Sequence, residues 1–338
     1  MAKLGEVCLL KAGKFVSAND ISPEYNKGLY PCFGGNGIRG YVADYTHDGE
    51  FPLIGRQGAL CGNVNLASGK FHATEHAVVV QPKIEMNVQW LYYALDAMNL
   101  GQYATGAAQP GLAVSKLETL SIEIPNISEQ NKIAQNLYKV EQLVSVRKRQ
   151  LAKLDELVKA RFVELFHGQG YPALKWKDVF DTTTGKLDSN AAVENGIYPF
   201  FTCSKEVLRI DKYAFEQKAL LLAGNNAAGK YDVKYYNGKF NAYQRTYVLG
   251  LKENWSYRVF QYQLEDKLEY LQQQSLGGLT KYLTLKILGE LSFIIPPKDR
   301  QDEFDAFVER VDQQKQSVQK SLEKLELMKK ALMQEYFG

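Results

Sequence analysis

The sequence predicts an α+β protein with two mixed, mostly β domains, each followed by a long helix. The two helices are expected to pack as an antiparallel coiled coil with pseudo-two-fold symmetry. Two observations support this class: one long helical stretch occurs twice, and the Gly-rich and aromatic-rich segment before it recurs in looser form. The repeat is far longer than the roughly 20–50 residues of a solenoid unit, so the chain consists of two large similar halves.

The repeated helix follows Pro125 in the first half and Pro296 in the second, and its copies end at Phe166 and Phe337. Apolar residues recur at spacings of three and four, as on one face of a helix. An amphipathic helix roughly 60 Å long needs a partner along its length, and its own second copy is the obvious one. The residues expected to form the seam between the two helices are Leu137, Val140, Val144, Leu151, Leu154, Val158, Val308, Val311, Leu322 and Leu325.

Turn signals and helix ends divide the chain. Clusters such as Gly34–Gly37 mark loops of a β-rich domain, and Gly168 followed by Pro172 ends the first helix. The expected divisions are residues 1–124 for the first mixed domain, 125–167 for the first helix, 168–295 for the second mixed domain and 296–338 for the second helix.

Composition sets broad limits. Of 338 residues, 45% are hydrophobic, so the chain is expected to fold and bury a core. The net charge is only +3, so any binding of nucleic acid depends on local basic patches. The four cysteines form no CxxC pair, which indicates free thiols in a reducing compartment. The first residues, MAKLGEV, lack the apolar core of a signal peptide, and no apolar run reaches membrane-spanning length, so neither feature is expected. A cytoplasmic protein that does not contact a membrane is therefore expected.

Two fragments match nucleotide-binding motifs but lack the required context. Gly35–Gly40 fits GxGxxG, and Gly224–Lys230 fits most of a P-loop, with Tyr231 in place of the Mg²⁺-binding Ser or Thr. Each is followed by a strand-like sequence rather than by the helix whose N-terminus receives phosphate. Neither fragment therefore predicts a nucleotide site.

A third fragment offers an enzyme as the alternative. His72, Glu75 and His76 match the HxxEH arrangement of one class of zinc peptidase. That chemistry needs both histidines on one face of a helix, whereas a turn precedes this fragment and a Val-rich strand follows it. A zinc-dependent hydrolase using His72 and His76 is kept as an alternative, together with a coiled-coil adaptor that binds proteins.

Both halves concentrate side chains that suit base edges between the same framework positions. Arg and Lys match guanine, and Asn and Gln match adenine. The candidates are Arg56, Gln57, Asn63, Lys70, His72 and His76 in the first half, and Asn225, Asn226, Lys230, Lys239, Asn241, Gln244 and Arg245 in the second. Two like domains with different loops predict recognition of a bipartite, asymmetric DNA site whose gap is set by the helices.

These features resemble the DNA-specificity subunit of type I restriction–modification enzymes over essentially the whole chain. The resemblance rests on Pro125 with Glu129-Gln130, Pro296-Pro297 with Gln301, and the Leu-x-x-Leu ends at Leu151–Leu154 and Leu322–Leu325. It also rests on Ile54–Gly58, on Gly69–His76 and on Thr105–Leu112, which adds Gln109 to the DNA-binding candidates. The second half lacks the Gln-Pro dipeptide in the matching loop, Gly277–Tyr282.

The resemblance implies a non-catalytic chain within a larger enzyme. Two methylation subunits would carry S-adenosylmethionine and modify adenine N6, and restriction subunits would use ATP and Mg²⁺ to translocate and cleave DNA. This chain would bind double-stranded DNA and dock those subunits on its helices, without a cofactor or metal of its own.

Overall fold

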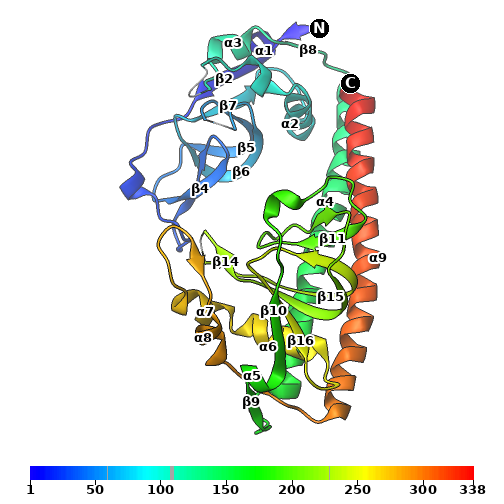
Figure 1. Cartoon of the computed structure of the whole chain (residues 1–338). Coiled ribbons are helices and arrows are strands. Elements are labelled where there is room, and N and C mark those ends of the chain that lie inside the picture. The colour runs from blue at the N-terminus through cyan, green and yellow to red at the C-terminus, as the bar shows by residue number, and fades with distance from the viewer. Residues whose placement is uncertain (59, 107–109, 228) are drawn as a thin grey trace. The chain divides into compact units, whose positions relative to one another are not determined.

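The computed structural model describes residues 1–58, 60–106, 110–227 and 229–338. The chain forms two compact units: unit 1 comprises Met1–Lys148 and Ser321–Gly338, and unit 2 comprises Arg149–Lys320. Each unit holds one mixed domain and one half of each long helix (Figure 1). The predicted fold class, two mixed domains each followed by a long helix and with the helices packed together, is confirmed.

In the domain of unit 1, helix α2 packs against strands β5 and β6 of the main sheet. The elements, in chain order, are β1 (Ala2–Lys3), α1 (Leu4–Val7), β2 (Cys8–Ala12), the 3₁₀ helix η1 (Ala18–Asp20), β3 (Tyr30–Gly34), β4 (Gly37–Val42), β5 (His47–Gly55), β6 (Val64–Ala73), β7 (Ala77–Pro82), α2 (Val88–Ala97), the 3₁₀ helix η2 (Leu100–Tyr103), α3 (Val114–Glu118) and β8 (Ser121–Ile122).

In the domain of unit 2 a similar series follows the first long helix, α4 (Ile127–Phe166). It consists of β9 (Ala173–Lys175), α5 (Trp176–Val179), β10 (Phe180–Thr184), the 3₁₀ helix η3 (Ser189–Ala191), β11 (Tyr198–Phe201), β12 (Leu208–Ile210), β13 (Phe215–Ala223), β14 (Asn225–Asn226), β15 (Val233–Ala242), β16 (Thr246–Leu251), α6 (Tyr257–Asp266), α7 (Leu268–Gln274), β17 (Lys281–Tyr282), α8 (Leu285–Gly289) and β18 (Ser292–Ile294), before the second long helix, α9 (Lys298–Phe337).

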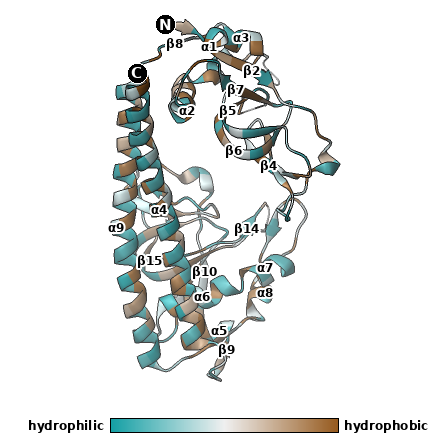
Figure 2. Ribbon diagram, turned by 180° about the vertical axis from the view of Figure 1, so that it is seen from behind, coloured by the Kyte–Doolittle hydropathy of each residue, from teal (hydrophilic) through white to brown (hydrophobic). Residues whose placement is uncertain are grey.

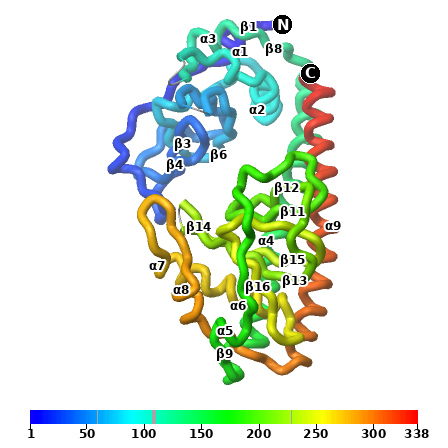
Figure 3. The backbone as a smooth tube through the Cα atoms, in the orientation of Figure 1, coloured from blue at the N-terminus to red at the C-terminus, as the bar shows by residue number. Residues whose placement is uncertain are grey.

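The main sheets of the two units have the same topology. Over the described residues, the strand order is β2-β7-β5-β6-β3-β4 in unit 1 and β10-β16-β13-β15-β11-β12 in unit 2. Figure 3 shows β3 and β4 beside β6 in unit 1, and β11 and β12 beside β15 in unit 2. Among the described strands, each sheet has one parallel pairing, β3 with β6 and β11 with β15. The register aligns Cys32 with His72 and Phe200 with Asn241. The loosely repeated sequence therefore encodes one fold twice, and residues at matching positions can be compared directly.

Glycine is required at the same place in both sheets. A Cβ on Gly13 would overlap the carbonyl of Ala73, and a Cβ on Gly185 would overlap that of Ala242. Both glycines follow the first strand of the main sheet and press against the end of the strand that makes the parallel pair. Any larger residue would push these backbone segments apart.

A buried glutamine ties the start of each long helix to its domain. Gln130 accepts a hydrogen bond from the backbone N–H of Asn87 at 2.9 Å and donates to the carbonyl of Pro125 at 2.8 Å. Gln301 makes the same two contacts with Ser256, at 2.7 Å, and Pro296, at 2.8 Å. The repeated Pro and Gln of the sequence thus make the same pair of hydrogen bonds in each unit, and these fix the position at which the long helix begins.

The long helices run in opposite directions beside each other within each unit. In unit 1, Lys329 lies 2.6 Å from Glu141, and Asn136 donates to the hydroxyl of Tyr336 at 3.1 Å. In unit 2, Lys315 pairs with Asp155 at 2.5 Å. Hydrophilic and hydrophobic residues alternate along both ribbons (Figure 2), as the spacing of the apolar residues predicts.

The residues predicted for the helix seam are buried or half-buried. Leu137, Val140, Leu154, Val158, Val308, Val311 and Leu322 are buried, and Val144, Leu151 and Leu325 are half-buried. Phe162, Phe304 and Val318 join the core of unit 2 as well, so aromatic residues widen the seam beyond the predicted set.

The four cysteines are free thiols, as predicted. In the described part of the chain, no helix combines the length and the apolar character that crossing a membrane requires.

Candidate nucleic-acid interface

In unit 1 the backbone gathers three polar segments around the end of β5. Arg56 donates its backbone N–H to the carbonyl of His76 at 3.0 Å and accepts from Leu112 at 2.9 Å. Gln57 bridges to Gly111, and Thr105 and Gly111 exchange two hydrogen bonds of 2.8 Å. The segments after β5, after β6 and before Leu112 therefore meet at one place. The backbone hydrogen bonds that join these three segments are called the frame below.

Unit 2 builds the same frame from different residues. Gly224 donates to the carbonyl of Arg245 at 2.8 Å and accepts from Leu283 at 2.8 Å. Leu276 and Tyr282 exchange hydrogen bonds of 3.1 and 2.8 Å, as Thr105 and Gly111 do in unit 1. Leu276 and Tyr282 thus take the places of Thr105 and Gly111, although Gly277–Tyr282 lacks the Gln-Pro dipeptide. Gln109 lies outside the described residues.

Two of the predicted residues of unit 1 line one hollow of about 370 Å³. Its lining consists of Gly35, Asn36, Arg39, Gln57, Gly58, Leu60 and His76. Gln57 and Arg39 are exposed, and the half-buried His76 pairs through Nε2 with Glu75 at 3.1 Å. An amide, a guanidinium and an imidazole in one open hollow suit the edges of bases.

Sequence reasoning missed Arg39 and Asn36. Both lie in the GxGxxG fragment, which was considered only as a nucleotide-binding motif. The sequence signal that could have revealed them is the turn cluster Gly34–Gly37, which marks the loop that holds Asn36 and leads into β4 with Arg39. Asn36 accepts a hydrogen bond from Asn63 Nδ2 at 3.0 Å. Asn63 therefore positions this loop, and the half-buried Arg56 contributes its backbone to the frame.

Two predicted residues turn inward instead of facing the surface. His72 is buried, and its Nε2 lies 3.1 Å from the carbonyl oxygen of Lys14. At the matching position Asn241 is also buried and donates to the carbonyl of Lys212 at 2.9 Å. Both side chains tie a loop to the sheet, which is a structural role.

Lys70 and Lys239 occupy matching exposed positions on β6 and β15. The ammonium of Lys70 lies 4.7 Å from the ring centre of Tyr45, and that of Lys239 lies 4.8 Å from the ring centre of Tyr213. Tyr45 raises the pKa of Lys70, and Glu216 followed by Tyr213 raises the pKa of Lys239. Both lysines keep their charge at neutral pH and suit phosphate, but neither lines the hollow beside Gln57.

In unit 2 the first two predicted residues after β13 form a short strand. Asn225 and Asn226 (β14) pair with Tyr282 and Lys281 (β17). Asn226 Oδ1 also accepts from the backbone N–H of Lys230 at 3.3 Å, so Asn226 shapes the turn that presents the exposed Lys230.

Gln244 and Arg245 complete the predicted set of unit 2, and both are exposed. Gln244 Nε2 donates to Asp188 at 3.3 Å, and the carbonyl of Arg245 accepts from the thiol of Cys203 at 3.4 Å. Arg245 stands where unit 1 has His76. Its backbone is fixed by the frame, and its guanidinium is presented to solvent.

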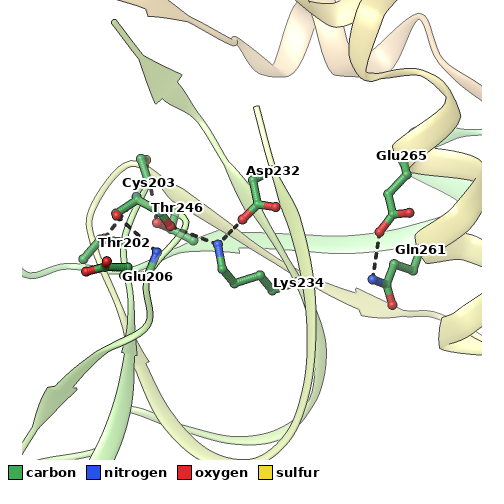
Figure 4. Close-up of polar contacts among 9 residues, drawn as sticks. Thr202, Cys203, Glu206, Asp232, Lys234, Thr246, Gln261 and Glu265 are labelled. Carbon is green, nitrogen blue, oxygen red and sulfur yellow. Dashed lines mark hydrogen bonds and ion pairs between the residues drawn. The ribbon is translucent and has the colours of Figure 1, made fainter. Parts of the chain in front are cut away.

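The loop after β11 is held by a lysine that the sequence reasoning did not select. Lys234 pairs with Asp232 and donates to the carbonyl of Ser204 at 2.9 Å, next to Thr202 and Glu206 (Figure 4). Lys234 and Asp232 lie at the start of β15, and Asn63 lies just before β6 in unit 1. Each unit therefore fixes this loop with polar contacts to the same strand, but with different residues.

The arrangement does not assemble the zinc peptidase motif. His72 lies on strand β6 and His76 in the loop before β7, so the two do not share a helix face. No group of three His, Cys, Asp or Glu residues that could hold a metal ion occurs within residues 1–58, 60–106, 110–227 and 229–338. The two frames instead present hydrogen-bonding and cationic side chains on matching backbones.

Comparisons with known proteins agree with the duplicated fold. A family model described as the type I restriction modification DNA specificity domain matches residues 1–156 and again residues 171–327. The specificity subunit of type I restriction enzyme EcoprrI from Escherichia coli is 52% identical over 143 residues, which cover 42% of this chain and 36% of that protein. The EcoDI specificity subunit from the same species is 32% identical over 170 residues, covering 47% of this chain and 37% of the relative.

A solved structure extends the likeness to the whole fold. The crystal structure of a type I restriction-modification system S subunit from M. genitalium has a TM-score of 0.70 and 19% sequence identity, covering 98% of this chain and 94% of that one. The matched stretches span little more than a third of the two E. coli relatives, but the family model covers both halves here. The chain, with one frame built twice, therefore belongs to the type I restriction-modification DNA specificity family.

Proposed function

We propose that this chain is the non-catalytic DNA-recognition subunit of a type I restriction–modification enzyme and that it reads a bipartite, asymmetric duplex site. The observation that supports this most directly is that both units have the same backbone frame but carry different side chains at its matching positions. Gln57 and His76 in unit 1 stand where unit 2 has Asn225 and Arg245. One backbone that carries different hydrogen-bonding groups is what reading two different half-sites requires.

Each unit combines groups for bases with groups for phosphates. In unit 1, Arg39 and Gln57 line the hollow and meet base edges, whereas Lys70 lies outside it and suits the DNA backbone. In unit 2, Arg245 and Asn225 meet base edges, and Lys230 and Lys239 contact the DNA backbone. Phosphate contacts position the protein, and base contacts specify the sequence.

The helices serve as spacer and docking scaffold in this proposal. In unit 1, Leu143 and Val146 on α4 and Leu327 and Met328 on α9 are exposed apolar side chains. Two ion pairs, Glu141 with Lys329 and Lys148 with Glu326, join the same segments of α4 and α9. The four exposed apolar side chains therefore lie at the same height along the helix pair. Two methylation subunits and the restriction subunits are the proposed partners, and S-adenosylmethionine, ATP and Mg²⁺ belong to them. The proposed location is the cytoplasm, where the DNA is.

A domain exchange tests the proposal. Residues 171–294 are replaced by the corresponding domain of another specificity subunit, and the methylated sequence is mapped in cells that express the partner subunits. The expected result is a change in one half-site only. A change in both half-sites, or in neither, would contradict independent reading by the two units.

Salt dependence separates DNA recognition from a protein adaptor. If the chain binds DNA through phosphates, the logarithm of its affinity falls linearly with the logarithm of salt concentration. The assembled complex and a 30-bp duplex that contains the mapped site are the materials. Affinity that does not respond to salt would favour the adaptor.

A further inference from the structure

The hollow beside Gln57 contains one side chain that the proposed base contacts do not use. Leu60 lines it together with Arg39, Gln57 and His76, and the side chain of Leu60 is 54% exposed. Among the described residues that line this hollow, Leu60 is the one with an apolar side chain, since the others are polar or glycine. A single exposed leucine is common on protein surfaces, so its position beside base-reading groups is the informative feature.

The backbone on both sides of Leu60 is held by hydrogen bonds. The N–H of Cys61 donates to the carbonyl of Gly58 at 3.0 Å, and the N–H of Asn63 donates to the carbonyl of Leu60 at 3.1 Å. Gly62 donates to the carbonyl of Gly55 at 2.7 Å and so ties the turn to the end of β5. The position of Leu60 relative to Gln57 is therefore fixed by the turn that joins β5 to β6.

The same turn is pressed against the body of unit 1. Gly62 has a φ of +89°, and a Cβ there would lie 2.1 Å from the backbone nitrogen of Gly101. Cys61 belongs to the hydrophobic core of the unit, whereas its neighbour Leu60 is exposed. Because the turn is anchored through Cys61 and Gly62, Leu60 is presented in a set position, which lowers the entropy cost of a contact with a ligand.

The chemistry of base edges indicates what Leu60 can contact. In the major groove, a glutamine amide suits adenine N6 and N7, and the apolar group that side chains contact is the C5 methyl of thymine. An adenine that pairs with thymine therefore presents both features on the same edge of one base pair. Gln57 and Leu60 lie three residues apart on one turn, so a carboxamide and an apolar side chain are available together for an A·T pair.

Unit 2 differs at this place. Its matching turn, residues 225–230, reads Asn-Asn-Ala-Ala-Gly-Lys, in which alanine is the largest apolar residue. The N–H of Gly229 donates to the carbonyl of Asn226 at 3.2 Å, as that of Cys61 donates to Gly58. The two turns thus share a backbone contact, but only the turn of unit 1 carries a long apolar side chain.

We propose that Leu60 determines specificity by contacting the C5 methyl group of a thymine in the half-site of unit 1, beside the adenine that Gln57 contacts. This inference rests on the proposed function and adds to it a group that hydrogen bonds cannot recognise. The contact removes the methyl group and the leucine side chain from water together, which favours thymine over bases without the methyl group. The half-site of unit 1 then contains an A·T pair.

The test replaces each thymine of the mapped site, one at a time, with deoxyuridine, which lacks only the methyl group. The domain exchange described above identifies the half-site of unit 1, and competition binding of the assembled complex measures the affinity of each duplex. At one thymine of that half-site the replacement should weaken binding about fourfold, the effect of burying one methyl group. Leu60→Ala should bind the thymine and deoxyuridine duplexes equally well, because it has lost the partner of the methyl group.

Leu9→Ala is the matched control, because Leu9 is an equally apolar exposed residue of unit 1 that does not line the hollow. It should keep the fourfold effect. The inference is wrong if the half-site of unit 1 has no A·T pair, if deoxyuridine has no effect there, or if Leu60→Ala keeps the effect. In those cases the parent complex still discriminates against single base changes, and the proposed function stands. A parent complex without any discrimination would overturn both.

Discussion

Gln130 on α4 accepts a hydrogen bond from the backbone N–H of Asn87 at 2.9 Å, and this contact joins the long helix to the N-terminus of α2. Gln301 and Ser256 form the same relationship in unit 2, at 2.7 Å. Both glutamines are buried, so their amides have no water to replace a lost protein partner. The repeated glutamine of the sequence is therefore a structural residue and not a contact for DNA.

Gln130→Leu should lower the free energy of unfolding by about 1–3 kcal/mol, because the N–H of Asn87 and the carbonyl of Pro125 lose their partner. Urea denaturation followed by circular dichroism measures the change. Gln135→Leu, on the exposed face of the same helix, is the control and should have little effect. Equal stability of the two variants would contradict a structural role for Gln130.

Gln57→Ala should reduce discrimination at one half-site by about 10–100-fold, which corresponds to the roughly 1–3 kcal/mol of a good bidentate base contact. The matched variant is Asn225→Ala, which should affect the other half-site. Competition binding of the assembled complex to duplexes with single base changes measures both effects. If both variants relaxed the same half-site, the assignment of one half-site to each unit would fail.

His72→Ala should destabilise the protein by about 1–3 kcal/mol without changing the recognised sequence, because its buried ring bonds the carbonyl of Lys14. Denaturation and methylome mapping measure the two properties. Metal analysis of the purified protein provides a further check. Stoichiometric zinc that disappears in the His72→Ala, His76→Ala double variant would revive the hydrolase alternative.

Glu265 gives a prediction for pH dependence. Burial raises the pKa of this carboxyl above its ordinary value of 4.5, and the hydrogen bond from Gln261 (2.9 Å; Figure 4) opposes that shift. The folded state then holds the proton more tightly than the unfolded state, so the contribution of Glu265 to stability falls as pH rises from the unfolded pKa through the raised folded value.

Glu265→Gln should therefore be more stable than the parent protein at neutral pH, and the difference should shrink as pH falls toward the ordinary carboxyl range. Chemical denaturation at a series of pH values measures it. An advantage for Glu265→Gln that grew at low pH would have the opposite sign and would refute the account.

The spacer role predicts an effect of helix length. Inserting four residues into the Val140–Leu154 stretch of α4 should change the number of base pairs between the two half-sites, because the helix sets their separation. Methylome mapping of cells that express the variant with its partners gives the gap directly. An unchanged gap, with both half-sites still recognised, would rule out the helix as the ruler.

The sequence by itself determined the duplicated layout, the two long helices and the free thiols. These follow from local signals: an apolar spacing of three and four, Pro before each helix, and Gly168 with Pro172 after the first. It also paired Gln130 with Gln301 correctly, although their function became clear only from their contacts with Asn87 and Ser256.

Only the tertiary structure decided which polar residues face solvent. His72 and His76 are four residues apart, yet His72 is buried against Lys14, and His76 lines a hollow with Arg39 of strand β4. Strand pairing brings together segments far apart in the chain, and a shift of register by one residue reverses the direction of every side chain. Spacing along the sequence identifies candidates for an interface, but the packing of the sheet determines which of them can reach a ligand.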